Sequence, residues 1–167
     1  MTTDIVREAR PEDVPTICRI AEQAWRAAYG DFLEESTIDA AMAEWYDPEV
    51  IHRRLDSESV GFFVADRDGE VLGFVNGNPA DEDGVAFLGA LYVDPDHWRE
   101  GLGATLLGAF ESFCRERGFQ SVRFGVLEAN DVGRSFYSQY GYEQVDDRKG
   151  DLFGQSITEA VYRRDLE

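Results

Sequence analysis

The sequence predicts a mixed α/β (α+β) protein in which one layer of β-sheet carries helices on its faces. The chain has 167 residues, enough to bury a core, and we expect a single domain over 1–167. Hydrophobic residues make up 43% of it, which argues against disorder. Apolar residues recur at helical spacing up to residue 55, whereas later segments alternate between strand-like and helix-like patterns.

The first third of the chain predicts one strand and three helices. A short strand over 4–9 comes first, and Pro11 with two acidic residues then starts a helix. Its apolar face consists of Val14, Ile17, Cys18, Ala21, Trp25 and Ala28. A second helix is expected over 35–46, and a third follows Asp47-Pro48 and runs to Leu55.

Strands and helices alternate in the remainder of the chain. Asp68-Gly69 lies between two strand-like runs and predicts a hairpin. The run over 84–93 shows no polar alternation, so we expect a strand that is covered on both faces. The elements expected after it are a helix from 102 to near Gly118, a strand over 121–127, a short helix between Asn130 and Gly141, and two strands over 142–147 and 155–163 around a polar turn.

The charge balance disfavours some functions. The formal net charge is −18, and Lys149 is the only lysine among 16 basic residues. Nucleic-acid binding is disfavoured because no basic stripe exists to meet phosphates. The acidic residues are explained first of all as a solvated surface. Acidity with almost no lysine is also typical of proteins from salt-accumulating halophiles, whose surface charges repel one another unless salt screens them.

Cysteine usage and hydropathy indicate the compartment. Cys18 and Cys114 are far apart and lie in helical patterns, so we expect reduced core thiols and neither a disulfide nor a metal site. No apolar run approaches the roughly 20 residues of a membrane helix. The amino terminus is polar and unlike a secretion signal. We therefore expect a cytoplasmic protein.

Two glycines stand where a helix begins, in the stretch "WREGLGATLL" over 98–107. Glycine inside a helix costs roughly 1 kcal/mol against alanine, so the pattern calls for a reason. A dinucleotide fingerprint would need a third glycine at Leu106, and an ATP-type phosphate loop would need a nearby lysine. Two interpretations stay open: an anion cradle of backbone N–H groups at the helix start, or a tight turn packed by small residues.

A second motif, "NDVGRSFYSQYGYE" over 130–143, places Asn130, Gly133, Phe136 and Tyr137 on one short helix after a strand. With the first motif, and with this order of elements over 60–147, the chain resembles the GNAT superfamily of N-acetyltransferases. The resemblance implies a mixed, mostly antiparallel central sheet with helices on both faces and two splayed central strands.

The resemblance also implies acetyl-CoA as co-substrate. Residues 98–104 would bind its pyrophosphate through backbone amides, and the strand over 84–93 would pair with the pantetheine arm. Asn130 would hydrogen-bond that arm, and Tyr137 would lie beside the sulfur. The implied cofactor-binding residues are Leu91, Val93, Trp98, Arg99, Gly101, Leu102, Gly103, Ala104 and Asn130, and the implied catalytic residue is Tyr137.

The chain departs from the family pattern at five positions. Trp98 holds the motif position usually taken by Arg or Gln, and Arg99 follows where glycine is common. Glu100 would repel phosphate unless it points away or pairs with Arg99. Gly133 replaces the usual alanine, which we expect to be a minor change. Phe87 stands where several members carry a catalytic Glu, so the usual base is missing.

Acetyl transfer needs a neutral amine and a proton for the leaving thiolate. A tyrosine, with an ordinary pKa of about 10, keeps its proton at neutral pH and can give it to a thiolate, so Tyr137 is the expected general acid. Glu22, Asp81, Glu82 and Asp83 are candidate bases acting through water, each of them better explained as a surface acid. Trp25, Tyr29 and Trp45 either line the acceptor site or belong to the core.

The predicted function is therefore acetyl-CoA-dependent transfer of an acetyl group to the amine of a small molecule or peptide. The alternative is a non-catalytic acyl-CoA-binding or sensing module, which Phe87 favours and Tyr137 argues against. We expect no metal, nucleic acid or membrane partner, and a homodimer is left open.

The charge predicts a salt response. Folding concentrates 34 acidic residues, and raising salt from about 0.1 M to 1 M shortens the screening length from roughly 10 Å to roughly 3 Å. We expect the melting temperature to rise with KCl between 0.1 and 3 M. A melting temperature that is level or falls would refute the halophilic interpretation.

Overall fold

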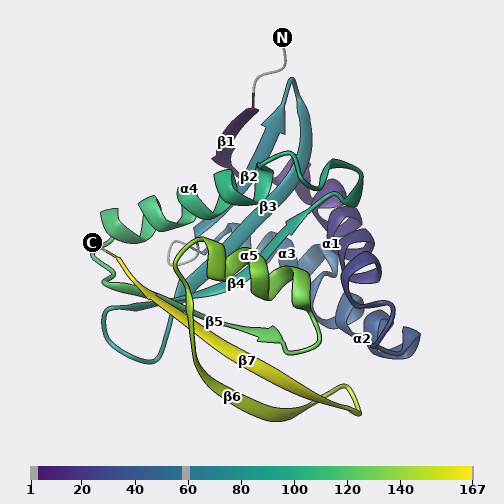
Figure 1. The fold of residues 1–167 in the computed structure, drawn as a ribbon. Helices are drawn as coiled ribbons and strands as arrows, with labels where there is room; N and C mark the ends of the chain where they lie inside the picture. The colour runs from purple at the N-terminus through teal and green to yellow at the C-terminus, as the bar shows by residue number, and fades with distance from the viewer. Residues whose placement is uncertain (1–3, 58–60, 167) are drawn as a thin grey trace.

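The computed structural model describes residues 4–57 and 61–166, so residues 1–3, 58–60 and 167 of the expected domain lie outside the described residues. Within the described residues, seven strands form one sheet in the order β1-β2-β3-β4-β5-β7-β6 (Figure 1). All neighbouring strands are antiparallel except β4 and β5. The strands are β1 Asp4–Glu8, β2 Gly61–Arg67, β3 Glu70–Pro79, β4 Val85–Val93, β5 Ser121–Leu127, β6 Glu143–Leu152 and β7 Gln155–Asp165.

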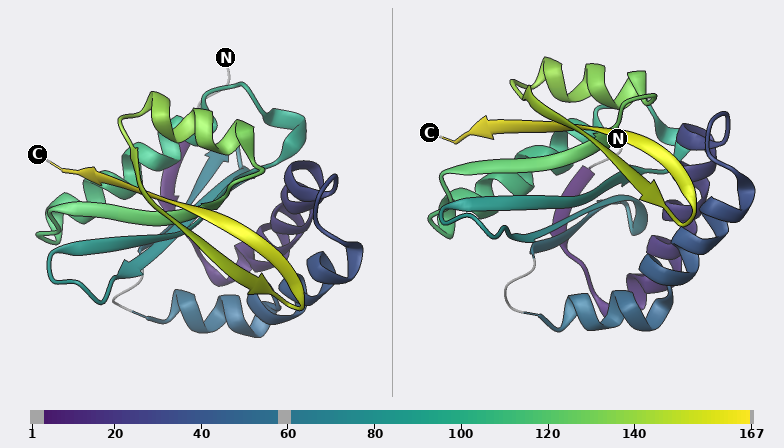
Figure 2. Two further views of the ribbon diagram at one scale, coloured as in Figure 1. Left: turned by 60° about the horizontal axis from the view of Figure 1, so that its bottom comes forward. Right: turned by 90° about the horizontal axis from the view of Figure 1, so that it is seen from below.

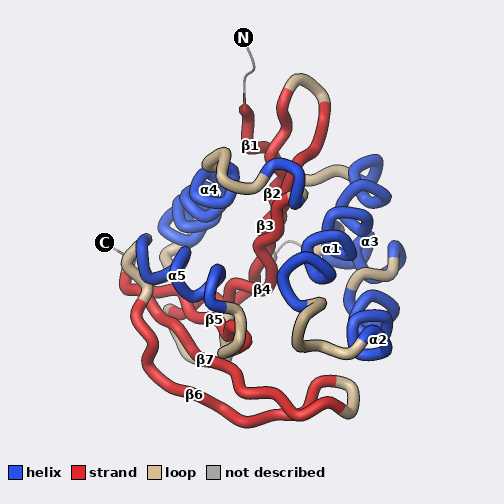
Figure 3. Tube along the Cα trace, turned by 45° about the vertical axis from the view of Figure 1, so that its right-hand side comes forward, coloured by secondary structure: helices blue, strands red, loops and turns tan. Residues whose placement is uncertain are grey.

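The part of the chain that the structure describes has five α-helices. They cover the two faces of the sheet, as Figures 2 and 3 show. Helices α1 to α3 lie on one face, which we call the front face, and α4 and α5 lie on the other, the back face. The helices are α1 Val14–Tyr29, α2 Glu35–Trp45, α3 Pro48–Leu55, α4 Leu102–Glu116 and α5 Asp131–Gln139, with short 3₁₀ turns at Pro11–Asp13 and Pro95–His97. None of the described helices is long and apolar enough to cross a membrane. The predicted fold class is confirmed.

Each face has its own core. The front core joins α1 to α3 to β2, β3 and β4 through aromatic residues such as Trp25, Tyr46 and Phe74. The back core packs α4 against the sheet through Leu106, Phe110 and their neighbours. Cys114 is buried in the back core and Cys18 is half-buried at the front core, and both are free thiols.

Two predictions about strands were wrong in detail. The expected polar turn over 147–154 is mostly strand, and β6 and β7 meet at a tight turn where Phe153 and Gly154 have φ of 49° and 90°. Because β6 is an exposed edge strand, its polar residues reflect solvent rather than a loop. β4 is also not covered throughout: Gly89 is exposed and Phe87 is 38% exposed.

The parallel strands β4 and β5 pair over only three residues each. Phe87 and Arg123 form the last pair, after which β4 keeps β3 as its neighbour and β5 keeps β7. The strands diverge beyond this point (Figure 1). A β-bulge lies just there, because Gly77 and Asn76 of β3 pair with Leu88 and Ala90 and leave Gly89 without a partner. The splay expected for the two central strands is present.

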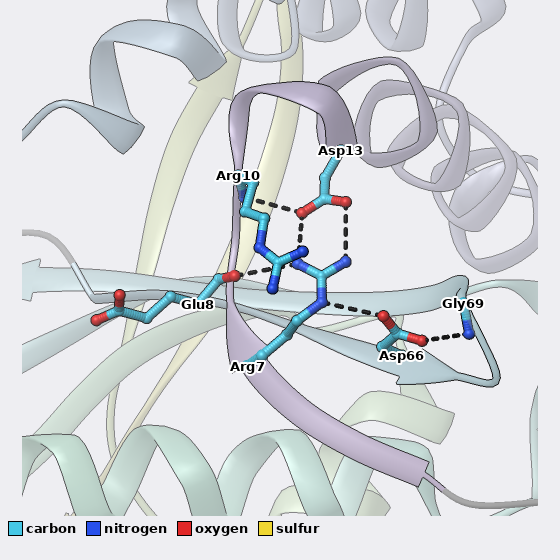
Figure 4. Close-up of polar contacts among 6 residues, drawn as sticks. All are labelled: Arg7, Glu8, Arg10, Asp13, Asp66 and Gly69. Carbon is cyan, nitrogen blue, oxygen red and sulfur yellow. Dashed lines mark hydrogen bonds and ion pairs between the residues drawn. The ribbon is translucent and has the colours of Figure 1, made fainter.

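Arg7 ties β1 to the start of the first helical segment (Figure 4). Its guanidinium donates two hydrogen bonds of 2.8 and 3.0 Å to Asp13 and one of 3.0 Å to Asp66 of β2. Asp13 is only 7% exposed and also accepts from the Arg10 amide at 2.8 Å. Burial by itself would raise the pKa of Asp13, but the bonds from Arg7 outweigh it and lower that pKa.

Replacing Arg7 with methionine should leave a buried, unpaired carboxylate. We expect a loss of roughly 3–5 kcal/mol in the free energy of unfolding at neutral pH. Because the pKa of Asp13 is lowered by folding, its contribution is present above its unfolded pKa and is lost on acidification. The difference between variant and wild type should therefore shrink below about pH 4.

Urea unfolding at several pH values measures this difference. Arg26→Met is the control, because the Arg26–Asp39 pair of 2.8 Å is exposed and should cost below about 1 kcal/mol. Equal losses in the two variants would show that the Arg7 cluster carries no special stability.

Candidate active site

The inner edge of β4 faces the opening between the parted strands. The amide of Asp94 donates to the carbonyl of Leu72 in β3 at 2.8 Å. Because backbone N–H groups alternate sides along a strand, those of Leu91 and Val93 point away from β3 and toward β5. No strand pairs with this edge among the described residues, since β5 contacts β4 only up to Phe87. An extended ligand could therefore bond to β4 as a neighbouring strand would.

The loop at the open end of β4 has an unusual backbone. Arg99 and Gly101 have φ of 67° and 84°, and Gly101 is the residue before α4. Within the described part of the chain, no carbonyl or side chain accepts from the amides of residues 99–104. The loop and the first turn of a 15-residue helix thus present a row of unbonded N–H groups, and such a row binds anions.

The side chains of this loop are arranged around that row. The indole N–H of Trp98 donates to the carbonyl of Val93 at 2.8 Å. Glu100 does not pair with Arg99; it bonds to Arg67 at 2.7 Å and lies 3.3 Å from His97. Hydrogen bonds from Arg67 and His97 lower the pKa of Glu100. The exposed Arg99 makes no ion pair with any described residue, so its guanidinium is available to an anion.

The two glycines serve different needs. Gly101 has open space around it, and its left-handed φ is what favours glycine there. A Cβ on Gly103 would lie 3.2 Å from two ring carbons of Phe136, so this glycine lets α5 pack on the first turn of α4. Leu102 is buried in the back core and Ala104 is half-buried. The loop therefore combines both interpretations left open by the sequence: it is packed by small residues, and its amides are unbonded.

Asn130 orders the start of α5. Its side-chain oxygen accepts from the Gly133 amide at 3.0 Å and caps the helix. A Cβ on Gly133 would meet the side-chain amide of Asn130, so an alanine here would require that amide to shift. The end of the second motif is structural as well: the Tyr142 hydroxyl donates to Glu111 at 2.8 Å, and Arg164 bonds to the same carboxylate.

Tyr137 reaches the opening from the back face. Its ring packs on Phe124 at a centroid distance of 4.2 Å. Removal from water raises the pKa of Tyr137 far above its ordinary value, and the nearby Tyr29 hydroxyl adds to this. Burial likewise raises the pKa of Tyr29, whose hydroxyl lies beside the side chains of Tyr92 and Asn130. Phenol groups from both faces therefore meet here, all of them protonated at neutral pH.

The aromatic residues of α1 belong to the core. Trp25 and Tyr29 are 5% and 8% exposed and contact each other edge to face, and Trp45 packs against the same cluster. Only the Tyr29 hydroxyl borders the opening. All three residues therefore belong to the core, and Tyr29 also places its hydroxyl beside Tyr92 and Asn130.

A cleft of about 330 Å³ opens on the front face beside the end of β5. Its walls are the α1–α2 connection (Phe32, Leu33), residues 127–129 and residues 155–158. Gln155, which the sequence analysis did not single out, holds the β6–β7 hairpin over it by bonding to the Glu34 amide, the Thr37 hydroxyl and the Phe32 carbonyl at 2.7 to 3.0 Å. A larger hollow of about 460 Å³ near Arg115 and Arg164 lies away from the opening.

The candidate bases are placed as surface acids. Glu22 is exposed and lies 3.4 Å from Arg26 in an ion pair. Glu82 contacts Arg163 and Arg123, at the paired end of β4 and β5. Asp81 and Asp83 are exposed in the same loop. Among the described residues, no group of His, Cys, Asp and Glu is arranged to hold a metal ion.

These features define an α/β protein with a site between two parted parallel strands, and comparison with known proteins identifies its family. The model of the "Acetyltransferase (GNAT) family" matches residues 17–142. The chain therefore belongs to the GNAT acetyltransferase family and is an N-acetyltransferase, which confirms the resemblance seen in its motifs.

Three relatives illustrate the similarity. The chain is 28% identical over 156 residues to the spermidine N(1)-acetyltransferase of Thermoplasma acidophilum. This match covers 89% of this chain and 92% of the relative. The PaiA N-acetyltransferase of Thermoplasma acidophilum, solved with coenzyme A, matches with a TM-score of 0.84 at 23% identity over 98% and 99% of the two chains. The ribosomal-protein-S18-alanine N-acetyltransferase of Escherichia coli gives 0.75 at 16% identity over 99% and 95%. At these identities the two structures establish the fold.

The packing of Gly103 on Phe136 predicts that two glycines of α4 respond differently in stability when each is replaced by alanine. Gly108 has no atom within 4 Å of an added Cβ, so Gly108→Ala should stabilise the protein by roughly 0.5–1 kcal/mol. Gly103→Ala should give no such gain, because Phe136 must move. Urea unfolding of both variants tests this. An equal gain in stability at both sites would show that the Phe136 ring moves away from an added Cβ without a measurable cost.

Proposed function

We propose that this enzyme transfers the acetyl group of acetyl-CoA directly to a primary amine. One observation carries the proposal: the bare inner edge of β4 ends in a loop whose successive amides are unbonded. A pantetheine arm needs an extended partner for its amides, and a pyrophosphate needs N–H donors. The inner edge of β4 offers the extended partner, and the loop offers the N–H donors.

The co-substrate would be held mainly by backbone. Amides of residues 99–104 would bind the pyrophosphate at the positive end of the α4 dipole. Arg99 would add a charge-assisted bond to phosphate. The amides of Leu91 and Val93 would bond to the pantetheine arm. Trp98, Leu102, Gly103 and Ala104 would shape the loop, and Asn130 would contact the arm from α5.

Tyr137 would act as the general acid. Its raised pKa keeps the phenol protonated over the whole working range of pH, so it can give its proton to the departing sulfur. Its position at the opening, across from the inner edge of β4, supports this role. Backbone N–H groups of β4 would polarise the thioester carbonyl.

The acceptor we favour is a small aliphatic polyamine such as spermidine. A relative that is 28% identical to this chain is named for that substrate. The front cleft of about 330 Å³ would admit a linear chain, and its lining combines apolar residues with polar ones and the acidic Glu128. A peptide amino terminus is the second candidate, since a fold relative is named for a ribosomal-protein alanine. We expect the enzyme to work in the cytoplasm.

Release of free coenzyme A thiol tests the proposal. The protein is incubated with acetyl-CoA and, separately, spermidine, an alanine-terminated peptide, or no amine. We expect thiol release that depends on spermidine, together with acetylspermidine in the product. Binding of acetyl-CoA without amine-dependent thiol release would instead support the non-catalytic module.

Tyr137→Phe should lower kcat by roughly 10²- to 10⁴-fold, because the proton donor is lost while the ring and its packing remain. The affinity for coenzyme A, measured by calorimetry, should stay within about twofold. Tyr140→Phe, on the exposed side of α5, is the control. An unchanged kcat with chemistry rate-limiting would remove Tyr137 from the mechanism.

A further inference from the structure

Glu159 of β7 is placed where the missing base is needed. It is the cross-strand neighbour of Leu127 in β5 and of Arg148 in β6. Its side chain leans along β5 and lies over the backbone of Gly125, so closely that a Cβ on Gly125 would overlap the Glu159 carboxylate. Gly125 is therefore the residue that allows this carboxylate to lie against the sheet.

Gly125 lies at the first open level between β4 and β5. Arg123 makes the last pair with Phe87, and in a parallel register the residues two further on are Gly125 and Gly89. Both glycines are exposed. The two strands thus carry no side chain here, and Glu159 lies over one of them.

The Glu159 carboxylate is on the front face, opposite Tyr137. Phe124 and Val126 of β5 point into the back core, so Gly125 and Leu127 point to the front, where Leu127 packs with the front core. Glu159 pairs with Leu127 and shares its face. Leu127 and Ile157 also line the front cleft, which therefore leads to Glu159.

The carboxylate has no partner among the described residues: no hydrogen bond or ion pair joins it to any residue in 4–57 or 61–166. The neighbouring cations on this face are engaged elsewhere. Arg123 and Arg163 contact Glu82, and Arg148 lies 3.8 Å from Asp146. Glu159 is half-buried and is thus free to bind a cation that enters by the cleft.

A second polar group, from β3, borders the same level beside Gly89 of β4. Asn76 of β3 is 4% exposed, its side chain lies against Gly89, and its Nδ2 is buried without a partner in the described part of the chain. The atom of Asn76 nearest to an added Cβ on Gly89 is Oδ1, at 2.8 Å, so an amide oxygen faces Gly89. The opening is thus bordered by an acceptor group on each side: the Glu159 carboxylate over Gly125 and the Asn76 side-chain oxygen against Gly89.

We propose that Glu159 binds the acceptor ammonium and is the base of the reaction; this rests on the proposed function. Glu159 takes one proton from the ammonium, directly or through one water, and leaves a neutral amine. The amine nitrogen bonds to the acetyl carbon of acetyl-CoA as the carbon–sulfur bond breaks. Tyr137 gives its proton to the leaving sulfur and regains one from the amide nitrogen. The products are the acetylated amine, coenzyme A and a proton on Glu159.

This arrangement accounts for Phe87. The usual carboxylate at that position would approach the amine from β4, whereas Glu159 approaches it from β7 over β5. The base and the acid then stand on opposite faces of the sheet, with the thioester between them.

Glu159→Gln tests the proposal, because it keeps the shape of the side chain and removes the proton acceptor. We expect kcat/KM for the amine to fall by roughly 10²- to 10⁴-fold with the affinity for coenzyme A unchanged. Activity of the variant should recover about tenfold per pH unit as the free amine becomes available, whereas wild type should change less. Glu159→Asp should keep the wild-type pH profile at lower activity.

Asp165→Asn, which makes the same charge change at the exposed end of β7, is the matched control and should behave as wild type. If wild type acetylates an amine and Glu159→Gln does so equally well, Glu159 is not the base and the proposed function stands. A fall in activity without recovery at high pH would assign Glu159 a structural role and overturn the proposal. If wild type acetylates no amine, the proposed function fails and Glu159 has nothing to deprotonate.

Discussion

The short pairing between β4 and β5 is the constraint on which the rest of the structure depends. Only three residues of each strand are joined, and each strand then keeps a single neighbour on its outer side. Backbone groups in a protein interior need partners, so an unpaired inner edge is stable only if a ligand or water supplies them. The bulge at Gly89 and the loop before α4 both lie along this edge, one at the level where it opens and one at its end.

The opening separates the inner edges of β4 and β5, and the back core joins the strands on its two sides, because it holds residues of β3, β4, β5 and β7. At the front, Leu127 of β5 packs with the front core, and hydroxyls of Tyr29, Tyr92 and Tyr137 approach one another from the two faces. Gln155 joins the β6–β7 hairpin to the α1–α2 connection at the front. The strands on the two sides of the opening are thus held together on both faces, while the inner edge of β4 stays unpaired beyond Phe87.

Residues of the site also stabilise the local structure around it. Asn130 caps α5 and borders Tyr29, and Gly103 begins α4 while leaving room for Phe136. Arg67 holds Glu100, and Trp98 bonds to the carbonyl of Val93. Such sharing keeps the loop over 98–104 in one backbone conformation before any phosphate arrives, and a preorganised donor row loses less entropy on binding.

The sequence by itself determined the elements, their order and both motifs, because hydrophobic period, caps and glycines act within a few residues of chain. It also indicated the splay, through the family resemblance of those motifs. It could not show that the polar stretch over 147–154 is strand, because an exposed edge strand needs no apolar alternation. Nor could it single out Glu159 among 34 acidic residues. Only the tertiary structure brought Glu159 of β7 over Gly125 of β5, 34 positions away in the chain, because strand register decides which distant residues share a face.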